Sequence, residues 1–183
     1  MDLWRSLGLL VLASGLGSCE GLPLDPETRS AEAVLFDTAG MRIGEAAFTE
    51  IEEDPVVVMR LQAWGLAPGV YGMHIHEAGV CESPDFETAG GHFNPFGKKH
   101  GLKNPDGPHA GDLPNLVVPL GGKVDVTLAI RRVTLGAGDH SLLPPQGTSL
   151  VIHADPDDGT TDPEGNSGPR IACGVIRPTL SAR

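Results

Sequence analysis

Six of the seven histidines in this chain lie, with one aspartate, in short motifs whose spacing is typical of metal ligands. The motifs are H-I-H at 74–76, G-H-F-N-P at 91–95, K-H-G at 99–101, H-A-G-D at 109–112 and V-I-H-A-D at 151–155. They supply His74, His76, His92, His100, His109, Asp112 and His153, and leave only His140 outside the set. Imidazole and carboxylate groups bind zinc, and imidazole also suits copper. The pattern therefore predicts metal chemistry.

The motifs fall into two kinds, each ambiguous by itself. His74 and His76 are two residues apart in a strand-like run, so their rings leave the same face of the strand. Taken alone, they are more often two ordinary polar strand residues. The loop motifs supply three imidazoles and a carboxylate, which suit tetrahedral zinc. Taken alone, they are as readily a polar loop with scattered histidines.

Together, the two kinds of motif complete each other. Three imidazoles, those of His74, His76 and His153, suit copper but leave a fourth ligand to be found. His92 is available, and an imidazole can bind one metal through each ring nitrogen. If His92 binds both metals, each metal has four protein ligands. The sequence thus predicts a copper site and a zinc site that share one histidine.

The segments that must position these residues read as short strands. Glycine and proline are abundant, at 25 and 16 residues, while aromatics make up 4%, which favours a turn-rich β protein. Consecutive valines at 56–58 favour a strand buried on both faces. The strand-like runs are Ala33–Asp37, Met41–Ile51, Pro55–Trp64, Val70–His76, Leu116–Leu120, Val124–Ile130, Thr148–His153 and Arg170–Ile176.

Two long segments, Glu77–Asp112 and Ala154–Pro169, lack a strand pattern. Loops of this length in a compact domain are usually functional or disordered. The first contains four of the candidate ligands, so we expect it to be functional.

The N-terminus predicts export. Residues 1–18 combine a short charged start with an apolar run too brief to span a membrane, as in a signal peptide. The segment Leu16-Gly17-Ser18-Cys19 resembles a bacterial lipoprotein cleavage box, which predicts a lipid on Cys19. A plain cleaved signal with a chance cysteine is the alternative. Residues 19–30 are then a lipidated tether and residues 31–183 the folded domain, in the periplasm or cell envelope.

Three cysteines leave one over if two of them pair. Cys81 and Cys173 can pair, with Cys19 as the odd residue, and an exported compartment would allow their oxidation. The formal net charge of −11 argues against nucleic acid as a partner.

A set of longer motifs resembles the copper–zinc superoxide dismutases of the bacterial secreted type, over Ala31 to Pro178. The matching stretches are G-V-Y-G-M-H-I-H-E, G-H-F-N-P, K-K-H-G, H-A-G-D-L-P-N, G-D-H-S-L, V-I-H-A-D-P-D-D and G-N-S-G-P-R-I-A-C-G-V-I. The resemblance implies an all-β fold, an eight-stranded Greek-key β-barrel or sandwich with two long functional loops. It does not fix the oligomeric state, because the dimer interface differs between branches of the family; a homodimer is compatible with it.

The resemblance also implies roles for individual residues. Copper would lie on His74, His76, His92 and His153, and zinc on His92, His100, His109 and Asp112. Cys81 and Cys173 match the family's disulfide. Arg170 matches the arginine beside copper, and Asp157 matches an aspartate that links a copper histidine to a zinc histidine. His140 matches a position that is not a ligand.

The implied reaction converts superoxide to O₂ and H₂O₂ by copper redox cycling, with His92 carrying a proton and Arg170 supplying a fixed positive charge. The alternative is a periplasmic copper- and zinc-binding module without turnover, which would have no need of Arg170. Because the protein is acidic, attraction of an anion must be local. Arg170 is one source of it. Lys98, Lys99 and Lys103 in the first loop are others, unless they only form a solvated loop face.

Overall fold

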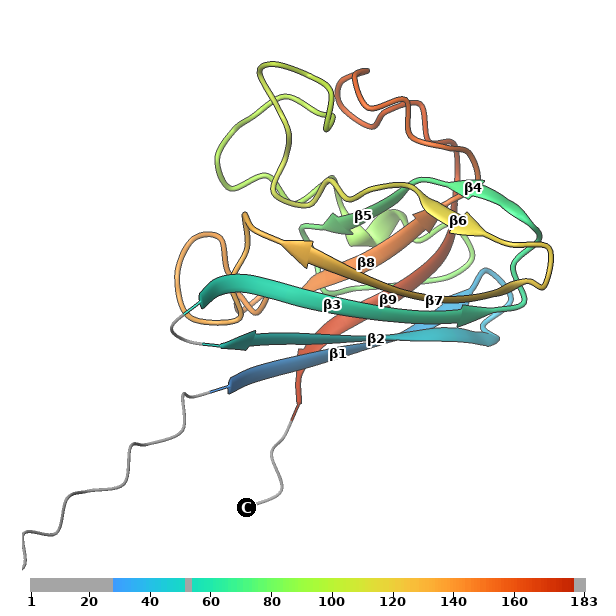
Figure 1. The fold of residues 1–183 in the computed structure, drawn as a ribbon, viewed down its shortest axis with the longest axis horizontal. Coiled ribbons are helices and arrows are strands. Elements are labelled where there is room, and N and C mark those ends of the chain that lie inside the picture. The colour runs from blue at the N-terminus through green and yellow to red at the C-terminus, as the bar shows by residue number, and fades with distance from the viewer. Residues whose placement is uncertain (1–27, 52–53, 180–183) are drawn as a thin grey trace, which may run out of the picture.

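The computed structural model describes residues 28–51 and 54–179 (Figure 1). Within these ranges the chain forms nine strands and one short 3-10 helix, η1 (Glu87–Ala89), so the predicted all-β class is confirmed. No helix in the described ranges is long and apolar enough to cross a membrane. The strands are β1 (Thr28–Asp37), β2 (Arg42–Ile51), β3 (Asp54–Trp64), β4 (Gly69–Tyr71), β5 (Met73–His76), β6 (Leu116–Val118), β7 (Lys123–Ile130), β8 (Thr148–His153) and β9 (Arg170–Pro178).

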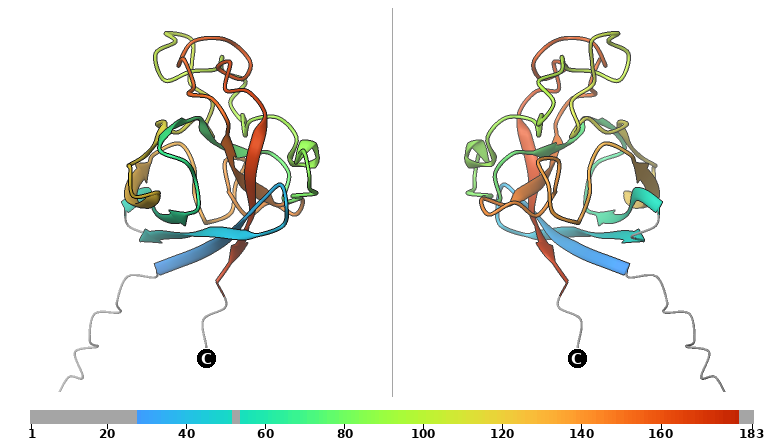
Figure 2. Two further views of the ribbon diagram at one scale, coloured as in Figure 1. Left: turned by 90° about the vertical axis from the view of Figure 1, so that its right-hand side faces the viewer. Right: turned by 90° about the vertical axis from the view of Figure 1, so that its left-hand side faces the viewer.

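Seven strands form one antiparallel sheet in the order β5-β8-β9-β1-β2-β3-β7. The sheet curls on itself, and Figure 2 shows the strands surrounding a central space that side chains fill. The two remaining strands, β4 and β6, pair with each other. The predicted run Val70–His76 is broken at Gly72, whose N–H donates to the carbonyl of Asp155 (2.8 Å). The chain therefore leaves the β4–β6 pair at this point and joins β8 as β5.

The core lies on the inner face of the curl. Along β3, Val57, Met59 and Leu61 are fully buried, whereas Val58 between them is 38% exposed. The expectation that this strand is buried on both faces is therefore wrong. A single curled layer has one face inside and one in solvent, so side chains alternate between the two.

Strand β1 begins at Thr28, within the segment expected to be a tether. Thr28 pairs with Ile51 and Ser30 with Thr49, so residues 28–30 belong to the sheet. The other residues of the expected tether, the expected signal peptide and Cys19 lie outside the described residues.

The two long loops leave β5 and β8 at opposite ends of this antiparallel pair but fold over the same side of it (Figure 1). The loop from Glu77 to Asp112 and the loop from Ala154 to Pro169 lie beside each other at the top of Figure 1, above β5 and β8. A hydrogen bond from the N–H of Lys103 to the carbonyl of Gly159 (3.0 Å) joins them. The ends of β5 and β8 and these two loops together enclose the site.

Candidate metal centre

The first group of ligand candidates is held by strands. On β5, Met73 and Ile75 point into the hydrophobic core, so His74 and His76 point to the opposite face, where the loops cover them. Both histidines are fully buried. β5 pairs with β8, whose last residue, His153, lies 3% exposed beside them.

The first long loop folds back onto β5 and brings its own ligand candidates there. The N–H of Ile75 donates to the carbonyl of Gly111, and the N–H of Phe93 donates to the carbonyl of Ile75, both at 2.8 Å. A Cβ at position 111 would lie 2.2 Å from the Ile75 oxygen, so only glycine permits this approach. The pairing sets His92 opposite His76 and Asp112 opposite His74.

His74, His76, His92 and His153 form a four-histidine cluster. One ring nitrogen from each lies within 4.8 Å of the others. Nε2 of His76 and Nε2 of His153 are 3.3 Å apart, and the ring centroids of His74 and His92 are 4.0 Å apart.

In three of these rings the nitrogen that points away from the cluster, here called the outer nitrogen, contacts an oxygen acceptor. His74 Nε2 lies 2.7 Å from Asp157, His76 Nδ1 lies 2.9 Å from the Gly90 carbonyl, and His153 Nδ1 lies 3.1 Å from the Gly168 carbonyl. Since each acceptor oxygen requires a proton on the nitrogen facing it, the opposite nitrogen of each ring keeps a free lone pair. All three lone pairs face the same small space.

A second group, the His–Asp cluster, consists of His92, His100, His109 and Asp112. Oδ1 of Asp112 lies 3.0 Å from Nδ1 of His92, 3.1 Å from Nδ1 of His100 and 3.3 Å from Nδ1 of His109. Its other oxygen accepts the backbone N–H groups of Gly101 (2.8 Å) and His109 (2.9 Å). The carboxylate is therefore fixed at the centre of three imidazoles.

The donor atoms fit metal ions better than they fit one another. Among the described residues, His74 Nδ1 and His92 Nε2 are buried without any hydrogen-bond partner, and His109 Nδ1, although 3.3 Å from Asp112, is buried without forming a hydrogen bond. Burying an unpaired polar atom is costly, and native structures rarely do it without reason. His92 has one nitrogen in each cluster, which suits a ligand shared by two metals. The reading of these histidines as satisfied core residues is thereby disfavoured.

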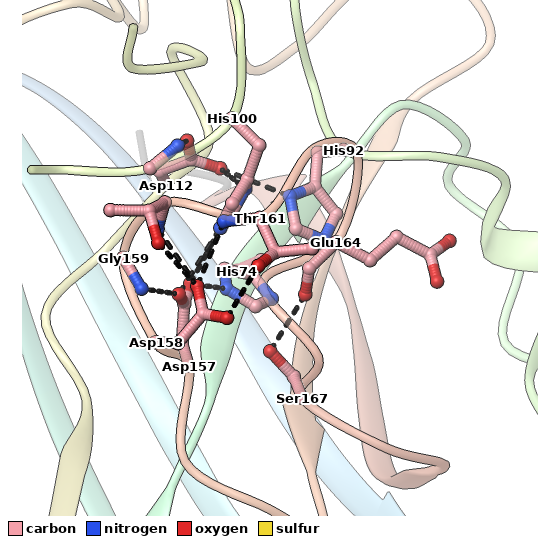
Figure 3. A network of polar contacts seen from close by, with 12 residues as sticks. His74, His92, His100, Asp112, Asp157, Asp158, Gly159, Thr161, Glu164 and Ser167 are labelled. Atoms are coloured by element: carbon pink, nitrogen blue, oxygen red, sulfur yellow. Dashed lines mark hydrogen bonds and ion pairs between the residues drawn. The ribbon is translucent and has the colours of Figure 1, made fainter. Parts of the chain in front are cut away.

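Asp157 joins the two clusters. Figure 3 shows its carboxylate between His74 and His100, with Oδ1 3.1 Å from Nε2 of His100. The backbone of Asp157 is held on both sides by Asn115, whose side chain accepts the Asp157 N–H (2.9 Å) and donates to its carbonyl (2.8 Å). Asn115 is thus a positioning residue that the ligand motifs did not reveal, although it stands in the H-A-G-D-L-P-N stretch.

The protonation behaviour of the two clusters is opposite. Burial lowers the pKa of His74 to about 3 and that of His153 to about 4, so both rings are neutral at pH 7. Burial also disfavours charge on His100, but hydrogen bonds to Asp112 and Asp157 outweigh it and raise the pKa of His100 to about 9. For Asp112, burial opposes ionisation, but hydrogen bonds from the histidines hold the pKa well below its usual range. A cation is therefore favoured in the His–Asp cluster.

Arg170, at the start of β9, lies beside the four-histidine cluster. Its guanidinium donates to the carbonyls of Phe86 (2.7 Å) and Gly90 (2.8 Å), and the Gly90 carbonyl also contacts His76. Glu87 lies 3.8 Å from the same guanidinium, a neighbour that no motif of the sequence indicates.

Cys81 and Cys173 form a disulfide that spans 92 residues and ties the first long loop to β9, three residues after Arg170. Disulfides persist in oxidising compartments, which favours a location outside the cytoplasm.

Two of the three lysines of the first loop contact the second loop. Lys99 forms an ion pair with Asp162 (2.8 Å), and Lys103 donates to the carbonyl of Asp158 (3.0 Å). Their charges therefore have partners within the loops. His140 lies outside both clusters, with its ring 5.8 Å from that of Phe96.

With this geometry established, the class of protein follows from comparison with known families. Residues 42–176, more than half of the chain, match the family model for copper/zinc superoxide dismutase. The chain belongs to this family.

Several of its relatives are bacterial. It is 52% identical over 149 residues to a copper–zinc superoxide dismutase of Aquifex aeolicus, a match covering 80% of this chain and 86% of that protein. It is 41% identical over 182 residues to the superoxide dismutase-like protein YojM of Bacillus subtilis, covering 92% of this chain and 93% of that protein. A crystal structure of a superoxide dismutase-like protein from Bacillus subtilis matches with a TM-score of 0.75 and 42% identity, over 79% of this chain and 96% of that one.

Proposed function

We propose that this protein is a superoxide dismutase that binds copper in the four-histidine cluster and zinc in the His–Asp cluster. Copper is assigned to His74, His76, His92 and His153, and zinc to His92, His100, His109 and Asp112. The observation that carries the assignment is the oxygen acceptor at the outer nitrogen of His74, His76 and His153. Each acceptor favours the tautomer whose other nitrogen has a free lone pair, and these nitrogens lie within 4.8 Å of one another and of a nitrogen of His92.

Bound copper supplies the one-electron redox chemistry that zinc cannot perform. The role of His92 follows from its two nitrogens. Nδ1 is held on the zinc side by Asp112, while Nε2 is buried and has no hydrogen-bond partner among the described residues. Nε2 therefore takes up a proton in the first half-reaction, which releases O₂. It donates that proton in the second, in which another superoxide takes up the electron released in the first, the proton of Nε2 and a second proton from water to give H₂O₂.

Arg170 binds and orients the anion. A guanidinium carries five N–H donors, and only two are used by the carbonyls of Phe86 and Gly90. The carbonyls fix the plane of the guanidinium. Its remaining donors and its positive charge can therefore bind the arriving anion without any rearrangement of the side chain. The alternative, a copper- and zinc-binding module without turnover, gives no role to a buried arginine held in this way.

We also propose that the protein acts in the periplasm or cell envelope, anchored to the membrane by a lipid on Cys19. The lipoprotein-like cleavage box and the disulfide support this location. Cys19→Ala should release the protein from the membrane fraction or block its processing. Wild type that is fully soluble and starts at another residue would contradict the anchor. Sedimentation of the same samples measures whether the protein is a monomer or a homodimer.

The function is tested on protein loaded with both metals. It should hold one copper and one zinc per chain and consume superoxide, measured by pulse radiolysis. Arg170→Gln should slow this reaction and Arg170→Glu should slow it further, because the second change reverses a charge that the first only deletes. Two bound metals without superoxide consumption would instead support the binding module. A single metal per chain at saturation would contradict the two-site assignment.

A further inference from the structure

A second carboxylate of the Ala154–Pro169 loop, that of Asp162, also reaches the His–Asp cluster. Its Oδ1 accepts the backbone N–H of His100 at 2.8 Å. The same oxygen lies 4.0 Å from Nε2 of His109, the outer nitrogen of that ring. Its Oδ2 accepts from Nζ of Lys99 at 2.8 Å. One side chain thus contacts the residue before His100, the main chain of His100 and the ring of His109.

The contact belongs to a close backbone junction between the loops. Gly101, in the left-handed region at φ +110°, packs against Gly159, and a Cβ there would lie 2.1 Å from the Gly159 carbonyl oxygen. The N–H of Lys103 donates to that same carbonyl. Because the main chains are joined here, Asp162 is held in place by more than its exposed ion pair.

The outer nitrogens of His100 and His109 each face a different carboxylate, and Asp162 is one of the two. The outer nitrogen of His100 faces Asp157, while that of His109 faces Asp162. A metal-bound histidine normally donates its other N–H to a carboxylate, a carbonyl or water, which fixes the ring and raises its basicity. Among the described residues, Asp162 is the acidic residue that lies within ion-pair distance of this nitrogen of His109.

We propose that Asp162 is a positioning residue of the zinc site, which holds His100 through its backbone and His109 through its outer nitrogen. The proposal rests on zinc occupying the His–Asp cluster. Asp162 is 35% exposed on its side chain and its distance to His109 is long, so its effect should lie near the lower end of the range for such partners. We expect zinc release to be about 10-fold faster without it.

Three variants separate the contributions. Asp162→Ala removes every contact. Asp162→Asn keeps an oxygen for the His100 N–H but removes the charge that faces His109. Lys99→Gln removes only the exposed ion pair, which is worth little by itself. All are compared as full-length, copper- and zinc-loaded protein.

Two readouts are used, neither of them enzymatic activity. The first is the rate at which a chelator removes zinc. The second uses cobalt(II) in place of zinc, with NMR of the paramagnetically shifted His109 ring N–H. We expect zinc release to accelerate in the order Lys99→Gln, Asp162→Asn, Asp162→Ala. Solvent exchange of the His109 N–H should be faster in both Asp162 variants and unchanged in Lys99→Gln.

Three outcomes would overturn the inference. If Lys99→Gln releases zinc as fast as Asp162→Ala, the carboxylate only ties the loops together. If zinc release and His109 exchange are unchanged in Asp162→Ala, it positions nothing. Wild-type protein that takes up no zinc would overturn the proposed function together with this inference, whereas the first two results leave the proposed function intact.

Discussion

The two halves of the metal centre use the same side chain in different settings. In the four-histidine cluster, three of the four rings stand at the ends of β5 and β8, and their outer nitrogens face one carboxylate and two backbone carbonyls. In the His–Asp cluster every ligand belongs to the first long loop, and the loop is held by carboxylates. The sheet therefore positions most of the four-histidine cluster, whereas interactions with carboxylates position the His–Asp cluster.

This difference explains the opposite pKa shifts of the histidines. Burial without enough neighbouring negative charge keeps His74 and His153 neutral, whereas Asp112 and Asp157 favour a proton on His100. Neutral rings are ready to bind a metal, while a protonated ring must first release its proton. Copper-side affinity should thus depend on packing, and zinc-side affinity on pH and on the carboxylates.

The largest effect should come from His92→Ala, which removes the link between the halves. Each metal would keep three of its four ligands, so both should still bind, more weakly and independently. Loss of the proton carrier alone should slow superoxide consumption by about 10²–10⁴-fold. Metal analysis and pulse radiolysis on the same sample check this. A nearly normal rate would show that the proton comes directly from solvent.

The next largest effect should come from Asp157→Ala, which should weaken the binding of the two metals to different extents. Losing a partner of this kind weakens metal affinity by roughly 10–100-fold. Zinc should lose more than copper, because His100 stands on a loop while His74 stays fixed by β5. Competition with chelators for each metal measures the two affinities. Asp158→Asn is the matched control, since in the part of the chain that the structure describes this side chain forms hydrogen bonds only within its own loop. Equal losses for both metals would contradict the comparison.

Metal-free protein should show the same contrast as a function of pH. The folded pKa values of His74, about 3, and His153, about 4, lie below the unfolded value of about 6.5. The unfolded chain therefore binds more protons in this range, and the free energy of unfolding should fall as pH drops below about 6.5.

His100 has the opposite sign in the same experiment. Its folded pKa of about 9 is raised, so its contribution is complete below about pH 6.5 and is lost as pH rises through about 9. Urea unfolding across this range, with His153→Gln and His100→Gln, measures both limbs. His153→Gln should flatten the acid limb and His100→Gln the alkaline limb. If His153→Gln alters the alkaline limb instead, or His100→Gln the acid limb, the two clusters do not differ in their effect on the pH dependence of stability.

The smallest effects should come from exposed charges near the entrance. Glu87, 73% exposed on its side chain, lies 3.8 Å from Arg170, so Glu87→Gln should raise the rate of superoxide consumption several-fold at most. Replacing Lys98, Lys99 and Lys103 together by glutamine should lower the rate less than Arg170→Gln does, because two of them are already paired. A salt series tests both, since screening over ~8–10 Å should reduce each difference.

The residues that the sequence singled out as ligand candidates are those that the structure gathers into two clusters, because residue type and strand spacing are visible in the sequence. His74 and His76 share a face by strand geometry alone, and the long motifs specified the other ligands. What the sequence could not reveal are contacts made by main-chain atoms and between loops. The Gly90 carbonyl that joins His76 to Arg170, and the carboxylate of Asp162 against His100, depend on how two irregular segments pack. No periodicity encodes such packing.

The boundaries of the strands were predicted less well, for a related reason. The break at Gly72 arises from a hydrogen bond to Asp155, 83 residues later, and the early start of β1 from its pairing with Thr49 and Ile51. Both are decided by a partner strand or loop, which local composition does not identify.

The position of β9 in the sheet determines when the centre can exist. The last strand lies between β1 and β8, with Phe36 opposite Cys173, and it carries both Arg170 and one half of the disulfide. Until ribosomal synthesis has delivered β9, β1 and β8 cannot be joined in one sheet, and β8 lacks one of its two neighbours. Pairing of the first strand with the last is also a contact of large sequence separation, which slows folding. The metal ligands, although complete by residue 153, are therefore held in place only after β9 has been synthesised.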